Sequence, residues 1–189
     1  MKNVIKTILL AFTICSCASF RTRIVRNVKA EIAPTELSVI DGTYSMNPSN
    51  YFNEKGESYE PNYKTRLNMY HYLRLSDSEA DSLANYQVTI KTLKNNLIQC
   101  VLKKDDVSID SVEIRGSLRS NGMFHFKDNE LECFGIPYIL GGCSQSKVRI
   151  GISKNNELLI NSAYNSEAAL LILFGNSMSY NSAFSFSRI

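Results

Sequence analysis

Few side chains in this chain have the types and spacing that acid–base or nucleophilic catalysis needs. Among the 189 residues there are two histidines, His71 and His125. Cys143, in the sequence Gly-Gly-Cys-Ser, could act as a nucleophile with His125 as its base, but such a pair also needs a third group to orient the base. A disulfide explains Cys143 equally well. We therefore expect no catalytic residue and no enzyme activity, and we assign His125, between Phe124 and Phe126, a structural role.

Cofactor and metal motifs are also missing from the sequence. It contains no G-x-S-x-G elbow, no phosphate-binding loop and no paired Cys-x-x-Cys spacing. Asp105, Asp106 and Asp110 form an acidic cluster, but a calcium loop needs more oxygen ligands in a set order, with a glycine and a distal glutamate. We expect these aspartates in a solvated turn, and we expect no cofactor and no metal.

Tyrosines gather in one part of the chain, between residues 44 and 72. A tyrosine offers a rigid apolar face and a hydroxyl, which suits a small amphipathic ligand. The same rings could instead cap the end of a folded domain. If a ligand binds, we expect a site with Tyr51, Phe52, Tyr59 and Tyr63 on a mobile loop and Tyr70 and Tyr72 at its base.

The first seventeen residues resemble the signal of a bacterial lipoprotein. Lys2 and Lys6 precede an apolar run over residues 8–14 that is too short to span a bilayer. The segment then reads Ile14-Cys15-Ser16-Cys17, which resembles a lipobox with Cys17 as the lipidated residue. This resemblance implies that residues 1–16 are removed and that acyl chains on Cys17 hold the protein in the membrane. An ordinary signal peptide or a buried apolar helix is the alternative.

The stretch after Cys17 has the composition of a basic tether. Arg21, Arg23, Arg26 and Lys29 come before the first acidic residue, Glu31. Surface lipoproteins of Bacteroidota typically carry acidic residues at this place, so the arginines favour the periplasmic side of the outer membrane. Charges nearly balance in the remainder, so no nucleic-acid partner is expected. We therefore expect a signal over 1–16, a lipid-anchored tether over 17–35 and a single β domain over 36–189.

Three cysteines remain in that domain, an odd number for an oxidising compartment. Cys133 and Cys143 flank a segment that contains Gly135, Pro137 and Gly141 and can turn back on itself, so we favour them as a disulfide pair, with Cys100 as a buried thiol. Two reduced, buried cysteines would give the same sequence pattern.

From residue 86 onward, apolar residues alternate with polar ones, as in half-buried strands. Turn signals at 95–96, 121–122 and 155–156 separate the runs as tight hairpins require. A change of phase near Asp110 predicts a bulge. Further strands are expected at 37–44, 131–140, 168–174 and 180–188, and short helices at 64–73 and 76–83. The pattern favours an all-β fold, a meandering antiparallel barrel or sandwich of about nine or ten strands with one or two short helices.

The mature chain is similar to the small uncharacterised lipoproteins of Bacteroidota. The similarity lies in the Cys17 lipobox, the spacing of Leu37, Gly42 and Tyr44, and the hairpin that leads into Phe124-His125-Phe126. Gly42-Thr43-Tyr44 also resembles the G-x-W of lipocalins, whose last strand carries an arginine, here Arg188, that packs across it. The first hypothesis is a non-enzymatic binder of a small apolar or amphipathic ligand. The alternative is an interaction subunit of an envelope assembly with an envelope protein as its partner, and a filled interior would favour that alternative.

Overall fold

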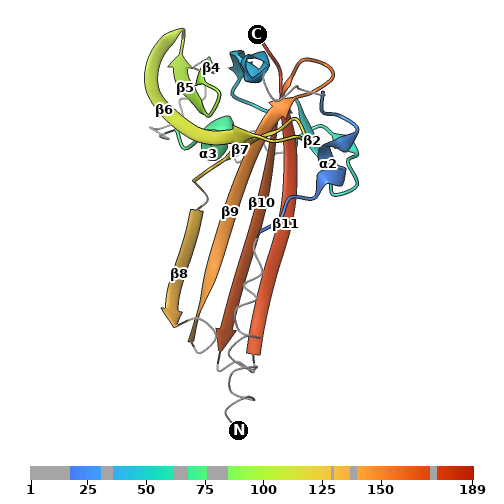
Figure 1. Cartoon of the computed structure of the whole chain (residues 1–189), viewed down its shortest axis with the longest axis vertical. Coiled ribbons are helices and arrows are strands. Elements are labelled where there is room, and N and C mark those ends of the chain that lie inside the picture. Colours follow the sequence, from blue (N-terminus) through green and yellow to red (C-terminus); the bar gives the residue numbers. More distant parts are fainter. Residues whose placement is uncertain are drawn as a thin grey trace.

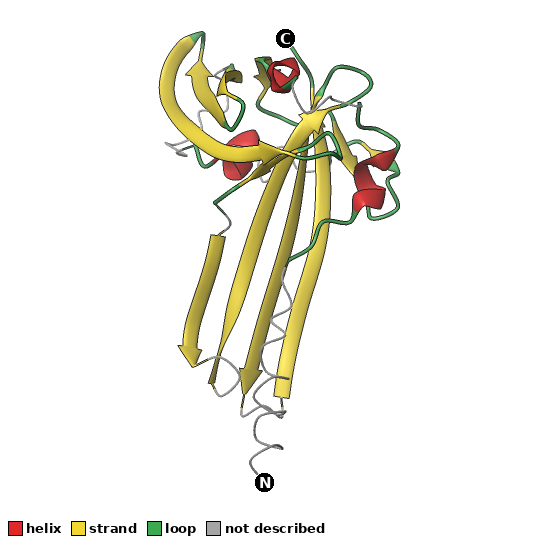
Figure 2. Cartoon of the chain, in the orientation of Figure 1, coloured by secondary structure: helices red, strands yellow, loops and turns green. Residues whose placement is uncertain are grey.

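The protein is described here from a computed structural model, which covers residues 18–30, 36–61, 68–75, 85–128, 130–136, 140–170 and 174–189. These residues form one mostly antiparallel sheet of eleven strands with two short α-helices (Figures 1 and 2). The expected all-β class is therefore confirmed. The strand order is β1-β4-β5-β6-β7-β9-β10-β11-β2-β3, and β8 pairs with β9.

The elements follow the chain in this order: α2 (Thr22–Arg26), the 3-10 helix η1 (Leu37–Ile40), β1 (Gly42–Ser45), β2 (Asn50–Phe52), β3 (Ser58–Tyr59), α3 (Met69–Leu73), β4 (Tyr86–Lys94), β5 (Leu97–Lys104), β6 (Val107–Leu118), β7 (Phe124–Phe126), β8 (Glu130–Ile136), β9 (Leu140–Ile152), β10 (Leu158–Leu170) and β11 (Phe174–Phe186).

The hairpin turns lie where their residue types predict them. Residues 95–96 join β4 to β5, and Gly122 and Asn156 have positive φ angles of 72° and 63° between their strand pairs. Asp105 and Asp106, at φ 49° and 66°, make the fourth tight turn, between β5 and β6. Asn, Asp and Gly tolerate this region of backbone space, and the mirror-image turns it produces match the twist of the strands. The acidic pair is therefore a turn, as expected.

At one end, the sheet curls into a barrel-like body. The named strands do not close the sheet, but two hydrogen bonds join β1 to the residues after β11. The amide of Ser45 donates to the carbonyl of Ser187 (2.9 Å), and the amide of Ile189 donates to the carbonyl of Thr43 (2.9 Å). One contiguous core occupies the enclosed space. Its large side chains come from β1, α3, β4, β5, β7, β9, β10 and β11 and include Tyr44, Met69, Leu73, Ile90, Ile98, Phe124, Ile150, Ile160, Phe184 and Phe186. The interior is therefore filled with side chains.

Arg188 packs across Tyr44 where the C-terminal residues meet β1. Its guanidinium carbon lies 5.3 Å from the centre of the tyrosine ring, and its Nη2 donates to the Tyr44 hydroxyl (2.7 Å) and to the carbonyl of Val39 (2.8 Å). The Tyr44 hydroxyl donates in turn to Ile40 (2.8 Å). A Cβ at Gly42 would lie 3.0 Å from Arg188 Nε, which explains the small residue there. This is the contact that the resemblance implied for these positions.

At the other end, four strands continue beyond the body as a flat projection (Figure 1). We call β8, β9 up to Lys147, β10 from Ala163 and β11 up to Asn181 the projecting sheet. Its distal end is the row where Leu140 pairs with Ile136 and Leu170, and Leu170 with Phe174. We call the face of the sheet that bears core residues such as Ile150 the inner face, and the opposite face, which bears Arg149, the outer face.

Residues 18–30 lie along the outer face and do not form a free tether. Ile24 and Val25 of α2 are fully buried in a second apolar cluster with Leu159. The Ala18 amide donates to Gln145 Oε1 (3.0 Å), and the Arg21 amide donates to a β11 asparagine. We call this segment the strap. The tether expected over 17–35 is wrong for this part, because apolar side chains between the arginines have a surface to cover.

The strap also explains a second difference from expectation. The alternation of apolar and polar residues along 148–153 predicts that Arg149 and Ser153 lie on a solvent-exposed face of the sheet. Both side chains are instead buried, at 1% and 2% exposure. In the structure, the strap covers this face: Lys29 forms a bridge with Ser153. A segment more than a hundred residues away in sequence thus converts an outer polar face into a second buried layer.

Five further expectations differ from the structure or fall outside it. Residues 37–44 begin as η1 and become a strand only at Gly42, and the segment of Tyr51, Phe52 and Tyr59, which was expected as a mobile loop, contains the short strands β2 and β3. The strand expected at 168–174 is divided in the described chain: β10 ends at Leu170, β11 begins at Phe174 opposite it, and residues 171–173 lie outside the described residues. The helix expected over 76–83 lies outside the described residues, and only Met69–Leu73 of the other is seen as helix.

Candidate functional site

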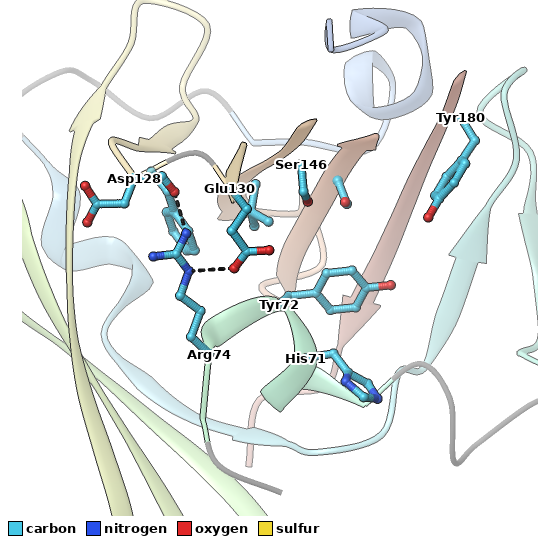
Figure 3. A pocket seen from close by; sticks show the side chains of 10 residues that line it. His71, Tyr72, Arg74, Asp128, Glu130, Ser146 and Tyr180 are labelled. Atoms are coloured by element: carbon cyan, nitrogen blue, oxygen red, sulfur yellow. Dashed lines mark hydrogen bonds and ion pairs between the residues drawn. The ribbon is translucent and has the colours of Figure 1, made fainter. Parts of the chain in front are cut away.

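A small pocket lies where α3 meets the inner face of the sheet (Figure 3). Its volume is about 190 Å³, room for about six water molecules at liquid density. The helix supplies one wall and β9–β11 supply the other. Its lining consists of His71, Tyr72, Arg74, Phe126, Asp128, Glu130, Ser146, Val148, Ser162 and Tyr180. The lining joins residues at the margin of the core, Phe126 and Val148, to residues of the projecting sheet, Ser146 and Tyr180.

Aromatic rings and hydroxyls make up the wall of this pocket. Tyr72 packs on Phe184 with ring centres 5.6 Å apart, and burial raises the pKa of its hydroxyl while a hydrogen bond with Ser182 opposes that shift. Tyr180 stacks on Tyr164 with ring centres 4.9 Å apart, and burial also raises the pKa of the Tyr180 hydroxyl. Both phenols therefore stay neutral at physiological pH and can donate or accept hydrogen bonds.

The other rim of the pocket is charged and already paired. Arg74 follows α3 in a left-handed conformation, at φ 58°. Its Nε lies 3.2 Å from Glu130 Oε1, and its Nη2 donates to the carbonyl of Asp128 (2.6 Å), as Figure 3 shows. Both charged side chains are largely exposed, so the pair contributes little to stability. It connects α3 to the start of β8.

The aromatic residues expected to form a ligand site do not converge. Tyr72 lines the pocket, whereas Tyr70 and Phe52 are buried in the two apolar clusters. Tyr51 packs on Phe184 with ring centres 5.3 Å apart, and Tyr59 is 49% exposed and bonded to Glu57. Tyr63 lies outside the described part of the chain. Tyr51, Phe52 and Tyr59 sit on the β2–β3 hairpin, and most of the expected set thus has packing roles.

His125 and Arg149 form a polar centre beneath the strap. The Phe20 ring lies 4.4 Å from the Arg149 guanidinium carbon and 5.2 Å from the His125 ring. Arg149 Nε donates to Asn161 Oδ1 (2.7 Å). Burial lowers the pKa of His125 to about 4, with the positive charges of Arg149 and Arg119 adding to the shift. His125 is therefore neutral at pH 7, and its ring packs against Phe20 of the strap.

The three cysteines that the structure describes have no catalytic arrangement. Cys133 and Cys143 face each other on β8 and β9 and are joined by a disulfide, the pairing that the sequence favoured. Cys143 is therefore unavailable as a nucleophile. Cys100 is a buried free thiol whose pKa burial raises to about 12, so it is neither ionised nor accessible.

The exposed edge of β11 is a feature that the sequence did not reveal. Residues 175–180 are all exposed, and none of them is charged or proline. Tyr180 is 48% and Met178 58% exposed. In the described chain β2 pairs with β11 only over 183–185, so no strand covers this edge. Natural edge strands usually carry lysine, proline or a bulge that blocks pairing with other chains. This edge carries none of them.

Residues 18–30, 36–61, 68–75 and the rest of the described chain contain no group of three or more His, Cys, Asp or Glu side chains arranged to hold a metal ion. Within the same described part, no helix has the length and apolar character needed to cross a membrane. No protein-family model, curated protein or solved structure matches the chain.

Proposed function

We propose that the protein is a lipid-anchored, non-enzymatic subunit of a bacterial envelope assembly, which binds a partner protein through the open edge of β11. The lipid anchor is Cys17, on the lipobox resemblance, and the outer membrane facing the periplasm is the proposed location. Because the body is filled with side chains, a ligand inside the barrel is disfavoured, and the interaction function takes precedence.

One observation carries the proposal: residues 175–180 form an exposed, uncharged edge strand without any blocking feature. An edge strand presents a row of unpaired backbone donors and acceptors, and an extended peptide can join such a row as an added strand. Tyrosine, serine and asparagine, which make up much of this edge, give rigid contact area and adaptable hydrogen bonds at recognition surfaces. We therefore expect the partner to contribute an extended segment.

A second candidate function follows from the pocket between α3 and the sheet. Its tyrosines and serines suit a small amphipathic molecule, but its volume of about 190 Å³ is below the usual range of ligand pockets, about 300 Å³ or more. Native mass spectrometry of protein purified from its own envelope tests this candidate. A bound small molecule that is lost in Tyr72→Ala would place the ligand-binding function first.

Photo-crosslinking tests the leading proposal. A benzophenone amino acid at Met178 should give one discrete protein adduct in intact cells, and Ser177→Lys with Ser179→Lys should abolish it while the urea midpoint is unchanged. Tyr59 is the control position, because it also lies on an edge strand and its exposed fraction of 49% is comparable with the 58% of Met178. An adduct that survives the two lysines, or that forms equally from position 59, contradicts the proposal.

A further inference from the structure

We infer that the distal end of the projecting sheet lies in the interfacial region of the bilayer that holds the lipid anchor. The inference rests on the anchor at Cys17 proposed above and concerns the end of the sheet rather than the β11 edge. Its partner is the lipid bilayer itself.

The position of Ala18 supplies the first step. Its amide donates to Gln145 Oε1, so it is held beside the middle of β9 on the outer face. Cys17 directly precedes Ala18 in the chain, and consecutive Cα atoms are about 3.8 Å apart, so the proposed lipid is attached one residue from this level. Leu140, the first residue of β9, lies five residues from Gln145 in the direction of the distal end, which corresponds to about 17 Å at 3.3 Å per residue. A lipid on Cys17 thus brings the membrane surface to a level that the sheet extends beyond.

The side chains of the distal end fit such a position. Phe134 and Leu140 lie on adjacent strands and are each 64% exposed. The first charged residues met from this end are Glu167, paired with Cys143, and Glu132, paired with Ser144. The uncharged length is therefore three residues of β9, or about 10 Å. Amphipathic segments bury their apolar faces about 5–10 Å into the interface.

Basic residues lie on the other side of the anchor level, toward the body. The Arg21 amide donates to Asn181 Oδ1. Asn181 is aligned across the sheet with Lys147, which lies two residues from Gln145 in the direction of the body. Arg23 and Arg26 lie further along the strap and are exposed. From the distal end toward the body the order is therefore exposed apolar residues, then Glu167 and Glu132 at about 7 and 3 Å from the anchor level, then the anchor, then basic residues. Basic residues beside a membrane surface are attracted to its anionic head groups.

Backbone chemistry limits how deep the end can go. The outer edges of β8 and β11 carry amides and carbonyls that no described strand pairs, and unpaired backbone groups are excluded from the hydrocarbon core. The distal end therefore stays in the interfacial region. Residues 177–180 of β11 remain at or above the level of the first charges, where a protein partner can reach them.

Tryptophan emission provides the test, because the natural chain contains no tryptophan. Phe134→Trp and Leu140→Trp are made separately in the full, acylated chain, with acylation verified by mass, and reconstituted in phosphatidylethanolamine–phosphatidylglycerol vesicles. We expect a blue shift in both variants and loss of emission when the vesicles contain brominated phosphatidylcholine. Val107→Trp is the matched control, because Val107 is 65% exposed on the barrel-like body at the turn into β6, and its emission should not change.

The two proposals fail in different ways. A mature protein without acyl chains on Cys17 overturns both the anchor and the membrane contact. Acylated protein in which the Phe134→Trp and Leu140→Trp variants stay unquenched by brominated lipid overturns the membrane contact alone. Shielding of these positions in native envelopes but not in pure lipid vesicles also overturns it, because a protein would then cover the distal end.

Discussion

Protonation of His125 should destabilise the protein below neutral pH. The ring is half-buried between the strap and β9, where burial, Arg149 and Arg119 lower its pKa from 6.5 to about 4. The unfolded chain binds this proton at about pH 6.5, so between pH 6.5 and 4 the unfolded state carries more protons than the folded state. Stability is therefore fully present above pH 6.5 and falls as the pH drops toward 4.

The size of the effect follows from the two pKa values. Their difference corresponds to a ceiling of about 3 kcal/mol. Because the ring is only half-buried, solvent screening reduces the expected loss to about 1 to 2 kcal/mol. Urea unfolding at pH 7.5 and at pH 5 measures the part of this loss that accumulates above pH 5, about 1 kcal/mol after screening, in a window where few carboxyl groups titrate.

Two variants separate this effect from general acid sensitivity. His125→Gln should remove most of the difference between pH 7.5 and pH 5, because glutamine can keep the contact with Asn121 without titrating. His71→Gln, at the exposed histidine of α3, should leave the difference intact. An unchanged pH dependence in His125→Gln, or an NMR titration that gives His125 an ordinary pKa, refutes the reasoning.

Three other outcomes are expected. Replacement of Cys133 and Cys143 by serine should lower the free energy of unfolding by about 2 to 3 kcal/mol, because a short closed loop is released in the unfolded chain, and a urea midpoint equal to that of the parent would contradict this. Arg188→Met should cost about 1 to 3 kcal/mol by leaving the buried Tyr44 hydroxyl without its charged partner, as measured in the same assay. Cys17→Ser should release the protein from membranes on fractionation, and continued anchoring would defeat the lipid assignment.

Local turn chemistry made much of the fold predictable. Gly122, Asn156 and residues 95–96 predicted their hairpins because a tight turn needs backbone angles that few residue types adopt. The bulge expected near Asp110 is present, since Leu102 pairs with Asp110 while Lys103 pairs with Ser108. Each of these features is decided within a few residues.

Long-range packing was the part that the sequence left hidden. The strap buries Arg149 on a face that alternation alone marks as polar, and nothing near Arg149 in the sequence indicates a cover. The pocket likewise joins α3 to β9–β11, and among the expected aromatic residues that the structure describes, Tyr72 alone lines it. The β11 edge depends on strand order, which no local pattern fixes.

Hydrogen–deuterium exchange of the acylated protein tests the central claim most directly, because strand addition forms backbone hydrogen bonds at a known place. The amides of residues 177–180, which lie at or above the first charged rows of the projecting sheet, should exchange rapidly in the detergent-purified monomer and slowly in native envelope membranes, while those of β3 exchange alike in both. Equal exchange of residues 177–180 in the two preparations would contradict binding at the β11 edge.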